Sequence, residues 1–508
     1  MSNHLIDRLL APRAGSARPL LALPAGAALF YGAFGARVNQ VARLLTDRGV
    51  GPGDRVAAQV PKSWQTLALY LGTIKAGGVF LPLNTAYTAK EVGYFVRDAE
   101  PMILVCDPGD AGELEPLMAS RDADPGGGSL LTLDAAGRGS LADGADTRDT
   151  EFDAVPRSPG DLAAILYTSG TTGRAKGAML THDNLWSNAE ALTDCWRFTV
   201  DDVLLHALPV FHTHGLFVAT NVLMVAGGRM IFLPGFRIDE IIHCLSRATS
   251  MMGVPTFYTR LLQDPRLDHG LVRHVRLFVS GSAPLLAETH DAFWERTGHR
   301  ILERYGMTET GMNTSNPYEG ERRAGTVGPA LPGVNVRVVD EQGGETAPAG
   351  EIGRVEVRGP NVFPGYWRMP EKTREEFTAD GFFITGDLGM LGEDGYLTIV
   401  GRSKDLIISG GYNVYPKEIE LVLDALPGVG ESAIIGVPHP DFGEGVVAVL
   451  TGDAPPDEER VRELVSGQLA RFKQPRRVFH VDALPRNSMG KVQKNLLREQ
   501  YADAFAAE

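Results

Sequence analysis

The sequence predicts an α/β protein whose large N-terminal part holds parallel sheets with flanking helices. A β-rich subdomain and a small α+β C-terminal domain are expected to follow it. Two observations predict this class: strands alternate with helices early in the chain, and short strands with turns replace that alternation from Asn335 onward. A third is length, because 508 residues exceed one hydrophobic core and predict at least two domains.

The N-terminal elements follow one another in the order that parallel sheets require. Apolar residues at helical spacing alternate with short apolar runs, and the segments in chain order are a helix over 33–48, a strand over 56–60, a helix over 63–75 and a strand over 79–83. Helices that connect successive parallel strands cover the faces of the sheet. The Gly- and Asp-rich stretch 107–157 is interpreted mostly as a surface excursion with little functional content.

The remaining elements set the predicted domain boundaries. Strands are expected over 333–339 and 351–357, then a helix over 416–426 and a strand over 433–437. The predicted domains are 1–402, with its β-rich part at about 333–402, and 403–508.

Composition excludes several classes of function. The net charge of −14 argues against nucleic acid as a partner, since no basic stripe offsets it. Three scattered cysteines predict neither a disulfide framework nor a metal site, which suits a reducing, cytoplasmic compartment. No apolar run of about 18 residues is present, so we expect no membrane partner and no spanning helix. The apolar stretch 19–30 is broken by Pro24 and is not expected to be a signal peptide.

A glycine- and hydroxyl-rich loop is the strongest local signal. It follows the apolar strand 162–167, and its candidate nucleotide-binding residues are Thr168, Ser169, Gly170, Thr171, Thr172, Gly173 and Lys176. Glycines admit an anion close to backbone N–H groups, and hydroxyls add donors. The spacing does not match the Walker pattern. A flexible polar surface loop is the alternative.

Four further motifs follow in order along the chain. They are Glu303–Thr310, Thr385-Gly386-Asp387, Gly401–Asp405 and Pro485–Lys491. With the loop, these five motifs resemble the core motifs of the adenylate-forming superfamily, which includes acyl-CoA synthetases, adenylation domains of nonribosomal peptide synthetases and beetle luciferases. The resemblance covers essentially the whole chain. Ala175 departs from it, because the family usually has Pro before the loop lysine.

The resemblance implies a reaction with ATP, Mg²⁺ and coenzyme A in two half-reactions. A carboxylate attacks the α-phosphorus of ATP, so the protein must supply positive charge and alignment. Lys491 is implied as the adenylation lysine, with Thr308 at the α-phosphate. Glu309 and Thr171 are implied as metal ligands, since Mg²⁺ prefers oxygen donors. The other implied nucleotide-binding residues are Tyr305, Gly306, Met307, Asp387 at the ribose hydroxyls and Arg402.

The second half-reaction needs a mobile C-terminal domain and a path for a thiol. By resemblance, Lys404 is the hinge about which that domain rotates, where many relatives carry Asp. The implied coenzyme A tunnel is lined by His212, Gly410, Gly411 and Tyr412. Free coenzyme A is the expected acceptor, since no carrier motif follows. The basic cluster 471–477 either meets coenzyme A phosphates or is an ordinary solvated helix end.

The predicted acyl pocket is polar. Its candidate substrate-binding residues are His212, Thr213, Arg260, Ser282 and Met307. A second buried carboxylate must be paired, and Arg does so in bidentate fashion, which predicts a short dicarboxylate. Segments 206–216 and 252–261 also resemble malonyl-CoA synthetases. By that resemblance Thr213 and Met307 bound the C2 carbon and select between malonate and methylmalonate. Arg237 is a weaker receptor, and His212 is equally a gate for coenzyme A.

The sequence hypothesis is an AMP-forming malonate–CoA ligase. The alternatives are a ligase for acetate, another short acid or an aryl propenoate, an enzyme that loads a carrier protein, and a luciferase-like oxygenase. Relatives are often controlled by acylation of the adenylation lysine. A protein acetyltransferase and deacetylase acting on Lys491 are therefore named as possible partners.

Overall fold

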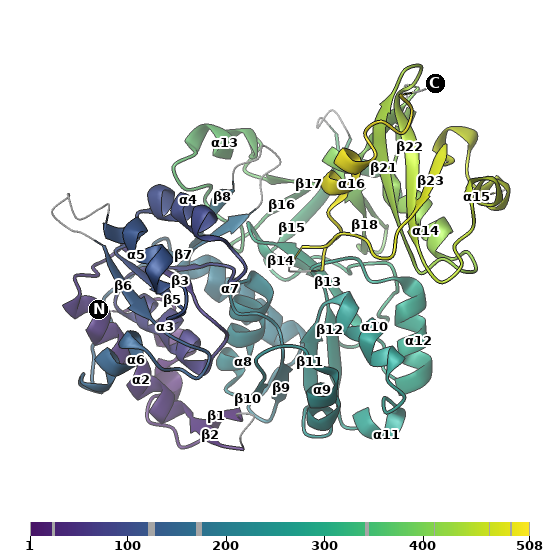
Figure 1. Cartoon of the computed structure of the whole chain (residues 1–508). Helices are drawn as coiled ribbons and strands as arrows, with labels where there is room; N and C mark the ends of the chain where they lie inside the picture. Colours follow the sequence, from purple (N-terminus) through teal and green to yellow (C-terminus); the bar gives the residue numbers. More distant parts are fainter. Residues whose placement is uncertain are drawn as a thin grey trace. The chain divides into compact units, whose positions relative to one another are not determined.

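The structure is a computed structural model that describes residues 2–22, 26–119, 128–168, 175–340, 345–410, 412–466, 468–487 and 490–506. The chain forms two compact units (Figure 1). The large unit comprises Met1–Asn335 and Arg358–Gly381, and the small unit comprises Val336–Val357 and Phe382–Glu508. The strands expected in the β-rich subdomain thus group with the last hundred residues, while the boundary after residue 402 stays a prediction.

The first sheet of the large unit has the strand order β6-β5-β3-β4-β7-β8. All neighbours are parallel except the hairpin β7–β8. Its strands are β3 (Arg55–Gln59), β4 (Val79–Pro82), β5 (Ile103–Cys106), β6 (Ser129–Thr132), β7 (Leu162–Thr168) and β8 (Lys176–Thr181). Helices α4 (Ala89–Ala99) and α5 (Ala111–Ala119) pack on one face through Phe95, Leu114 and Met118.

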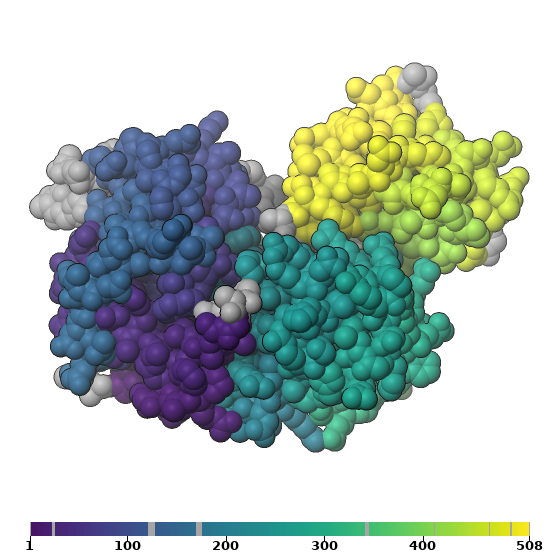
Figure 2. Space-filling view, turned by 60° about the horizontal axis from the view of Figure 1, so that its bottom comes forward, coloured from purple at the N-terminus to yellow at the C-terminus, as the bar shows by residue number. Residues whose placement is uncertain are grey.

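The second sheet has the order β14-β13-β12-β11-β9-β10-β1-β2, parallel except at its two edge pairs. Its strands are β1 (Pro19–Ala22), β2 (Ala28–Phe30), β9 (Val203–His206), β10 (Arg229–Phe232), β11 (Ser250–Gly253), β12 (Leu277–Ser280), β13 (Leu302–Met307) and β14 (Gly311–Ser315). The second sheet, mostly teal but with β1 and β2 in purple, lies beside the first (Figure 1), and Figure 2 shows the same parts of the chain in contact.

The helices of the large unit begin where the sequence supplies caps. Ser63 caps α3, and Thr88 with Glu91 and Thr181 with Asn184 form capping boxes at α4 and α7. The remaining helices are α1 (Ile6–Leu9), α2 (Tyr31–Asp47), α3 (Trp64–Lys75), α6 (Ser140–Asp146), α7 (His182–Cys195), a π-helix (His214–Ala219), α8 (Thr220–Ala226), α9 (Ile238–Leu245), α10 (Pro255–Gln263), α11 (His269–Val272), α12 (Ala287–Thr297) and α13 (Pro370–Glu375).

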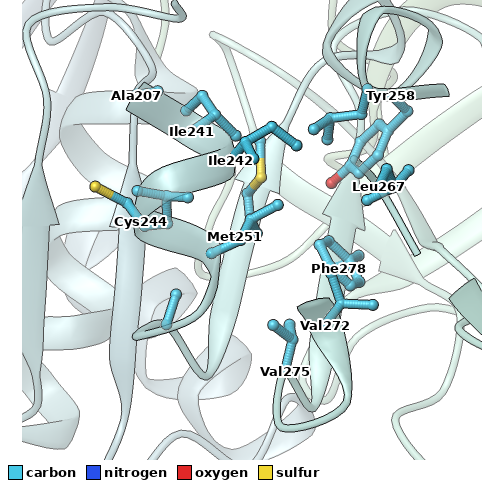
Figure 3. Packing of buried hydrophobic residues seen from close by; sticks show 14 of the residues in the cluster. Ala207, Ile241, Ile242, Cys244, Met251, Tyr258, Leu267, Val272, Val275 and Phe278 are labelled. Atoms are coloured by element: carbon cyan, nitrogen blue, oxygen red, sulfur yellow. The ribbon is translucent and has the colours of Figure 1, made fainter. Parts of the chain in front are cut away.

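A core of apolar side chains joins the second sheet to helices α9, α10 and α12. Figure 3 shows Ile241 and Ile242 of α9 beside Met251 of β11, and Tyr258 of α10 near Phe278 of β12. The buried Tyr258 hydroxyl donates a hydrogen bond to the Val279 carbonyl at 2.6 Å, which satisfies the one polar atom of its side chain. This core fixes the strands β11 and β12, whose ends carry candidate pocket residues.

The small unit contains two sheets. One has the order β15-β16-β17-β18 and consists of β15 (Asn335–Val339), β16 (Ile352–Arg358), β17 (Phe383–Leu391) and β18 (Leu397–Arg402). The other has the order β20-β19-β22-β21, with β23 beside β22; its strands are β19 (Ile407–Ser409), β20 (Tyr412–Val414), β21 (Glu431–His439), β22 (Gly443–Thr451) and β23 (Arg477–His480). Its helices are α14 (Pro416–Asp424), α15 (Glu458–Val465) and α16 (Lys494–Gln500).

The predicted α/β class with parallel sheets is confirmed, and one local prediction is wrong. The stretch 107–157 is largely part of the fold: it supplies α5, the edge strand β6 and α6, with Leu131 and Leu141 buried. Glycines and aspartates inside α5 and α6, such as Gly112 and Asp143, obscure the apolar residues of these short elements in the sequence. Cys106 and Cys244 are buried and, like Cys195, unpaired. Within the described ranges, no helix is long and apolar enough to cross a membrane.

Candidate active site

The glycine- and hydroxyl-rich loop connects the antiparallel strands β7 and β8. Thr168 ends β7 and pairs in register with Lys176, which begins β8. The Thr168 hydroxyl lies 3.5 Å from the Lys176 carbonyl oxygen, to which it donates. The predicted residues Ser169, Gly170, Thr171, Thr172 and Gly173, including the predicted metal ligand Thr171, lie outside the described residues.

The motif Tyr305–Glu309 lies on the hairpin between β13 and β14. Tyr305, Gly306 and Met307 belong to β13, where the register shifts after Tyr305. A Cβ at position 306 would lie 2.0 Å from the Gly311 carbonyl oxygen, so only glycine fits there. The backbone N–H of Thr310 donates to the Met307 carbonyl at 3.2 Å, which closes the turn that carries Thr308 and Glu309.

Lys176 and Glu309 belong to one cluster of charged and phenolic groups. The Lys176 ammonium donates to Glu376 Oε1 at 2.8 Å and lies 4.2 Å from the centre of the Tyr366 ring. The Tyr366 hydroxyl lies 2.6 Å from Glu376 Oε2 and 3.1 Å from Glu309 Oε1. Tyr366 and Glu376 were not predicted, because Glu376 is 200 positions from Lys176 and neither residue lies in a motif used above.

The environment of this cluster shifts two pKa values. Burial raises the pKa of Tyr366, and the Glu309 and Glu376 carboxylates raise it further, so the phenol keeps its proton. Burial alone would raise the pKa of Glu376, but hydrogen bonds from Lys176 and Tyr366 outweigh it and lower that pKa. Glu376 is therefore an ionised acceptor at neutral pH.

The residues present fit a Mg²⁺ ion that accompanies a triphosphate. Glu309 is 5 % exposed and supplies a hard carboxylate at the turn beside the phosphate-loop strands. Mg²⁺ in nucleotide sites takes one or two carboxylates from the protein and the remaining oxygens from phosphates and water. Glu309 would hold the ion, which when bound neutralises phosphate charge.

Two segments that carry predicted acyl-pocket residues meet at His214. His212 and Thr213 precede the π-helix, and Ser282 follows β12 with a positive φ of 73°. The Ser282 hydroxyl lies 3.3 Å from His214 Nδ1. Thr213 also lines a small cavity together with Thr308, which links the predicted acyl-pocket region to the predicted nucleotide-binding motif. Burial, followed by the Arg304 charge, holds the pKa of His214 well below its usual range.

Arg304 is a buried cation that the sequence analysis did not select. It is 3 % exposed, and its Nε and one terminal nitrogen have no hydrogen-bond partner among the described residues. Its guanidinium lies on bare backbone, since a Cβ at Gly281 would be 2.5 Å from Arg304 Cζ. Burial lowers the pKa of Arg304 to about 10, so it stays charged at neutral pH. The signal in the sequence was an adjacent pair of charged residues, Glu303-Arg304, inside an otherwise buried strand.

The two arginines considered from the sequence lie elsewhere. Arg260 is exposed on α10, and its guanidinium carbon is 6.0 Å from the centre of the Phe236 ring. Arg237 precedes α9 with 73 % of its side chain exposed, and it pairs with Glu240. Neither has the burial that the dicarboxylate argument requires.

A half-buried lysine supports the segment that carries His212 and Thr213. Lys62 donates to His206 Nδ1 and to the His206 carbonyl, both at 2.9 Å. His206 Nε2 then donates to the Gly215 carbonyl at 2.9 Å in the first turn of the π-helix. Burial holds the pKa of both side chains well below their usual ranges. This chain of hydrogen bonds ties the end of β3 to the pocket segment.

The small unit brings together two of its predicted residues. Arg402 Nε lies 2.8 Å from Asp387 Oδ1, and its terminal nitrogen donates to the Thr385 carbonyl at 3.0 Å. Asp387 is 4 % exposed on β17, and its partner extends from the paired strand β18. Lys404 is exposed on the 3-10 helix Ser403–Asp405, directly after this pair.

Lys491 is exposed at the end of a short turn. Its backbone N–H donates to Asn487 Oδ1 at 3.0 Å, and the Asn487 N–H donates to the Lys491 carbonyl at 3.0 Å. Arg486 donates to the Gly490 carbonyl and pairs with Glu431 on β21, which anchors the turn to the sheet. Gly490 supplies the positive φ of 76° that this turn needs.

Two predicted tunnel residues lie on the hairpin β19–β20 of the same unit. Gly410 has a φ of 60°, and its N–H donates to the Phe442 carbonyl at 2.9 Å. The exposed Tyr412 ring stacks on Phe472 at 4.7 Å between centres. Gly411 lies outside the described residues.

Comparisons with known proteins show the family to which the chain belongs. Residues 14–367 match the family described as AMP-binding enzyme, and residues 418–491 match the AMP-binding enzyme C-terminal domain. The chain is 35% identical to a malonate–CoA ligase of Arabidopsis thaliana, over 88% of this chain and 78% of that protein. It is 36% identical to a sulfoacetate–CoA ligase of Cupriavidus necator, over 94% and 93%.

Among solved structures, the chain is similar to ATP-bound MatB from Rhodopseudomonas palustris. The two are 58% identical with a TM-score of 0.97, and the match covers 99% of this chain and 100% of the other. The chain therefore belongs to the AMP-binding enzymes, and it is an AMP-forming acid–CoA ligase that uses ATP with Mg²⁺ and takes coenzyme A as a substrate.

Proposed function

We propose that the acid is malonate, so that malonate, ATP and coenzyme A give malonyl-CoA, AMP and diphosphate through a malonyl-adenylate. One observation carries this proposal: the buried Arg304 guanidinium has two N–H-bearing nitrogens without partners in the described residues. A buried cation without partners costs free energy, and a carboxylate offers the two acceptors that a guanidinium prefers. An acid with a second carboxylate would supply them.

The neighbourhood of Arg304 supports a short acid. The guanidinium lies on the backbone of Gly281, next to Ser282, whose hydroxyl approaches His214. The fatty tail of a long acid would leave this charge unpaired. The relatives named for malonate and for sulfoacetate are named for acids in which one CH₂ group joins a carboxylate to a second anionic group. Methylmalonate is the further substrate we propose, with Thr213 and Met307 bounding the C2 carbon.

The roles of the other residues belong to the same proposal. Lys491 would bridge the attacking carboxylate and the α-phosphate, Thr308 would donate to that phosphate, and Asp387 would accept from the ribose hydroxyls. Lys404 remains our proposed hinge between domains 1–402 and 403–508. His212 and Tyr412 would line the path of coenzyme A.

The proposal includes regulation at Lys491 and a cytoplasmic location. Acylation of the exposed Lys491 by a protein acetyltransferase would remove the charge that adenylation needs, and a deacetylase would restore it. We place the reaction in the cytoplasm, which suits three unpaired cysteines.

The test is AMP release from purified protein with ATP, Mg²⁺ and coenzyme A. The acids are malonate, methylmalonate, sulfoacetate, acetate and 4-coumarate, and the variants are Arg304→Gln and Arg260→Gln. We expect malonate to be preferred and Arg304→Gln to lower kcat/KM for malonate by about 100-fold or more, because a buried charge-assisted pair is lost. Acetate turnover should change little, and Arg260→Gln, an equal loss of charge at an exposed site, should resemble the parent.

Two results would contradict the assignment. If Arg260→Gln impaired malonate turnover and Arg304→Gln did not, the receptor would be the exposed arginine. If acetate or 4-coumarate were preferred by the parent enzyme, the adenylation chemistry would stand and the dicarboxylate would be wrong. Preference for sulfoacetate would keep the Arg304 receptor and change the second anionic group.

A further inference from the structure

A buried histidine lies between two partners that decide which of its ring nitrogens carries the proton. His206 is 1 % exposed at the end of β9, and its Nε2 lies 2.9 Å from the Gly215 carbonyl oxygen. A carbonyl oxygen has no proton to give, so Nε2 must be the donor in this contact. Nδ1 then has a lone pair, and it accepts a hydrogen bond from Lys62 Nζ at 2.9 Å.

Lys62 also blocks the contact that would favour the other tautomer. Its Nζ donates a second hydrogen bond to the His206 carbonyl oxygen at 2.9 Å. The His206 ring lies close enough to bond to that same carbonyl, so a proton on Nδ1 could be satisfied there if the lysine were absent. Because Lys62 donates to both Nδ1 and the carbonyl, the proton stays on Nε2.

The start of α3 fixes the backbone on both sides of Lys62. Ser63 caps this helix, and its hydroxyl accepts from the Thr66 N–H at 3.2 Å. The Thr66 hydroxyl donates to the Pro61 carbonyl at 2.9 Å. Lys62 Nζ also lies 4.3 Å from the centre of the Phe232 ring, which holds the end of the side chain in place.

The carbonyl that the histidine ring contacts belongs to a closed turn. The Leu216 N–H donates to the His212 carbonyl at 2.9 Å, which closes the turn 212–216 around Gly215. The Gly215 carbonyl accepts from the histidine ring and also from the Thr220 hydroxyl at 2.9 Å. These two side chains therefore set the position of the turn.

This turn carries part of the predicted acyl pocket. Thr213, which is 4 % exposed, and His214, whose Nδ1 lies 3.3 Å from the Ser282 hydroxyl, come directly before Gly215. A Cβ at Gly215 would lie 2.0 Å from the Pro209 carbonyl oxygen, so the turn packs tightly against backbone. A shift of the Gly215 carbonyl must therefore displace the Thr213 side chain as well.

We propose that Lys62 is a positioning residue: it keeps the His206 proton on Nε2 and thereby fixes the turn 212–216, which sets the preference of the pocket for the substituent at C2 of the acid. In the other tautomer, the lone pair of Nε2 would face the lone pairs of the Gly215 carbonyl and push the turn away. The inference rests on the proposed acyl pocket, and it is independent of the contacts with the nucleotide.

A purely structural role for Lys62 is the competing explanation. Contacts without the lysine already hold α3 beside the π-helix and α8: the Tyr70 ring lies 5.6 Å from the Phe217 ring, between centres, and Asn221 Nδ2 donates to the Tyr70 hydroxyl at 3.3 Å. Lys62→Met keeps these contacts and an unbranched side chain, so the variant is expected to fold.

The experiment measures kcat and KM by AMP release for pairs of acids that differ by one methyl group at C2, malonate with methylmalonate and acetate with propionate. Lys62→Met should lower kcat/KM for malonate about tenfold, because the pocket wall is misplaced. Methylmalonate should lose less than about threefold, since the displaced wall leaves room for a methyl group. The KM for ATP should stay within about twofold of the parent value.

Substitutions of His206 test the tautomer itself. In His206→Gln the amide nitrogen can take the position of Nε2 and is always a donor, so the ratio of the two acids should stay within about threefold of the parent. Asparagine is too short to reach Gly215, so His206→Asn should resemble Lys62→Met. Adding Lys62→Met to His206→Gln should change the ratio no further, because an amide needs no lysine to fix its donor.

Lys75→Met is the matched control. Lys75 is also half-buried, lies at the other end of α3 and donates to Asn39. Its replacement removes the same group from the same helix and should leave both acids unchanged. Thermal unfolding of each variant should match the parent within a few degrees.

The outcomes are distinguishable. Parent selectivity in Lys62→Met would overturn the inference, and so would equal losses for both acids of a pair, which indicate a structural role. A further loss on adding Lys62→Met to His206→Gln would also overturn it. If Lys62→Met did not fold, the contrast between His206→Gln and His206→Asn would decide in the same way. If the parent does not use malonate, the proposed acid is wrong, and acetate with propionate still tests Lys62.

Discussion

At the scale of the residue, buried polar side chains that have no hydrogen-bond partner among the described residues point to binding or to pH-dependent stability. Arg304 is one, and His182 is another: it is fully buried, and neither ring nitrogen has a hydrogen-bond partner among the residues described. Burial, together with the nearby Arg157 charge, lowers the pKa of His182 to about 4. Such a histidine is neutral in the folded chain at neutral pH. We expect it to make the free energy of unfolding depend on pH, and we assign it no catalytic role.

His182 should make folding weaker in acid. Its folded pKa of about 4 lies below its unfolded value of about 6.5, so the unfolded chain binds the proton more readily. Its contribution is therefore complete above pH ~6.5 and is lost as the pH falls from there toward ~4, by about 3 kcal/mol at most. Urea unfolding of the parent and of His182→Gln at pH 7.5, 6 and 5 measures this loss.

As the pH falls, the free energy of unfolding of the parent should decrease relative to that of His182→Gln. His243→Gln, at an exposed histidine of α9, is the matched control and should follow the parent at every pH. Parallel curves for the parent and His182→Gln would show that the buried ring keeps its ordinary pKa.

Packing between α2 and α3 illustrates the scale of the element. Gly35 of α2 and Gly72 of α3 face different surroundings. A Cβ at Gly72 of α3 would lie 2.7 Å from Val41 Cγ1 of α2, whereas a Cβ at Gly35 of α2 would meet nothing within 4 Å. Gly72 therefore permits close approach of the helices, and Gly35 only adds flexibility to the unfolded chain.

Alanine should have opposite effects at these two positions. Gly35→Ala should raise the free energy of unfolding by about 0.5–1 kcal/mol, because alanine restricts the unfolded chain and nothing obstructs its methyl group. Gly72→Ala should lower it by about 1–3 kcal/mol through overpacking against Val41. Denaturant midpoints of the two single variants measure both changes, and stabilisation by Gly72→Ala would contradict the close contact.

Sequence patterns predicted the elements better than they predicted the contacts between them. The expected helix over 63–75 is α3 with Ser63 as its cap, and the expected strand over 79–83 is β4, because periodicity and capping are local properties. The stretch 107–157 was missed because its three short elements have too few apolar residues for a periodic signal. Motif residues such as Asp387 and Arg402 were found, and their pairing across β17–β18 needed the register of the strands.

The remaining site residues were beyond the reach of a linear pattern. Glu376 meets Lys176 across 200 positions, and Tyr366 meets Glu309 across 57. Arg304 lies inside the motif Glu303–Thr310, yet its importance arises from burial and from the absence of a side chain at Gly281. Such properties exist only once the strands are assembled.

At the scale of the whole molecule, the proposed chemistry is divided between two compact units. The phosphate-loop lysine Lys176, Glu309 and Arg304 belong to the large unit, and Asp387, Arg402 and Lys491 belong to the small unit. Each unit has its own core, so each can keep its local geometry while the other changes. Two half-reactions can therefore depend on different residues of the small unit.

Loss of Lys491 should separate the two half-reactions. Lys491→Ala should reduce malonate-dependent AMP release by about 100-fold or more, because the charge that bridges two anions is lost. Formation of malonyl-CoA from supplied malonyl-adenylate and coenzyme A should stay near the parent rate. Lys90→Ala, at an exposed lysine of α4, is the control for loss of a positive charge. Equal losses in both assays would show that Lys491 serves more than adenylation.

The bare backbone beneath the Arg304 guanidinium also constrains how this pocket can evolve. Any side chain at position 281 must occupy space that the guanidinium fills, since a Cβ there would lie 2.5 Å from Arg304 Cζ. A lineage that drifts toward uncharged acids must therefore give up the cation before position 281 can accept a larger residue. If position 281 changed first, the resulting variant would hold a displaced, buried arginine charge. Acid preference in this pocket should change by an ordered pair of substitutions, with the arginine replaced first.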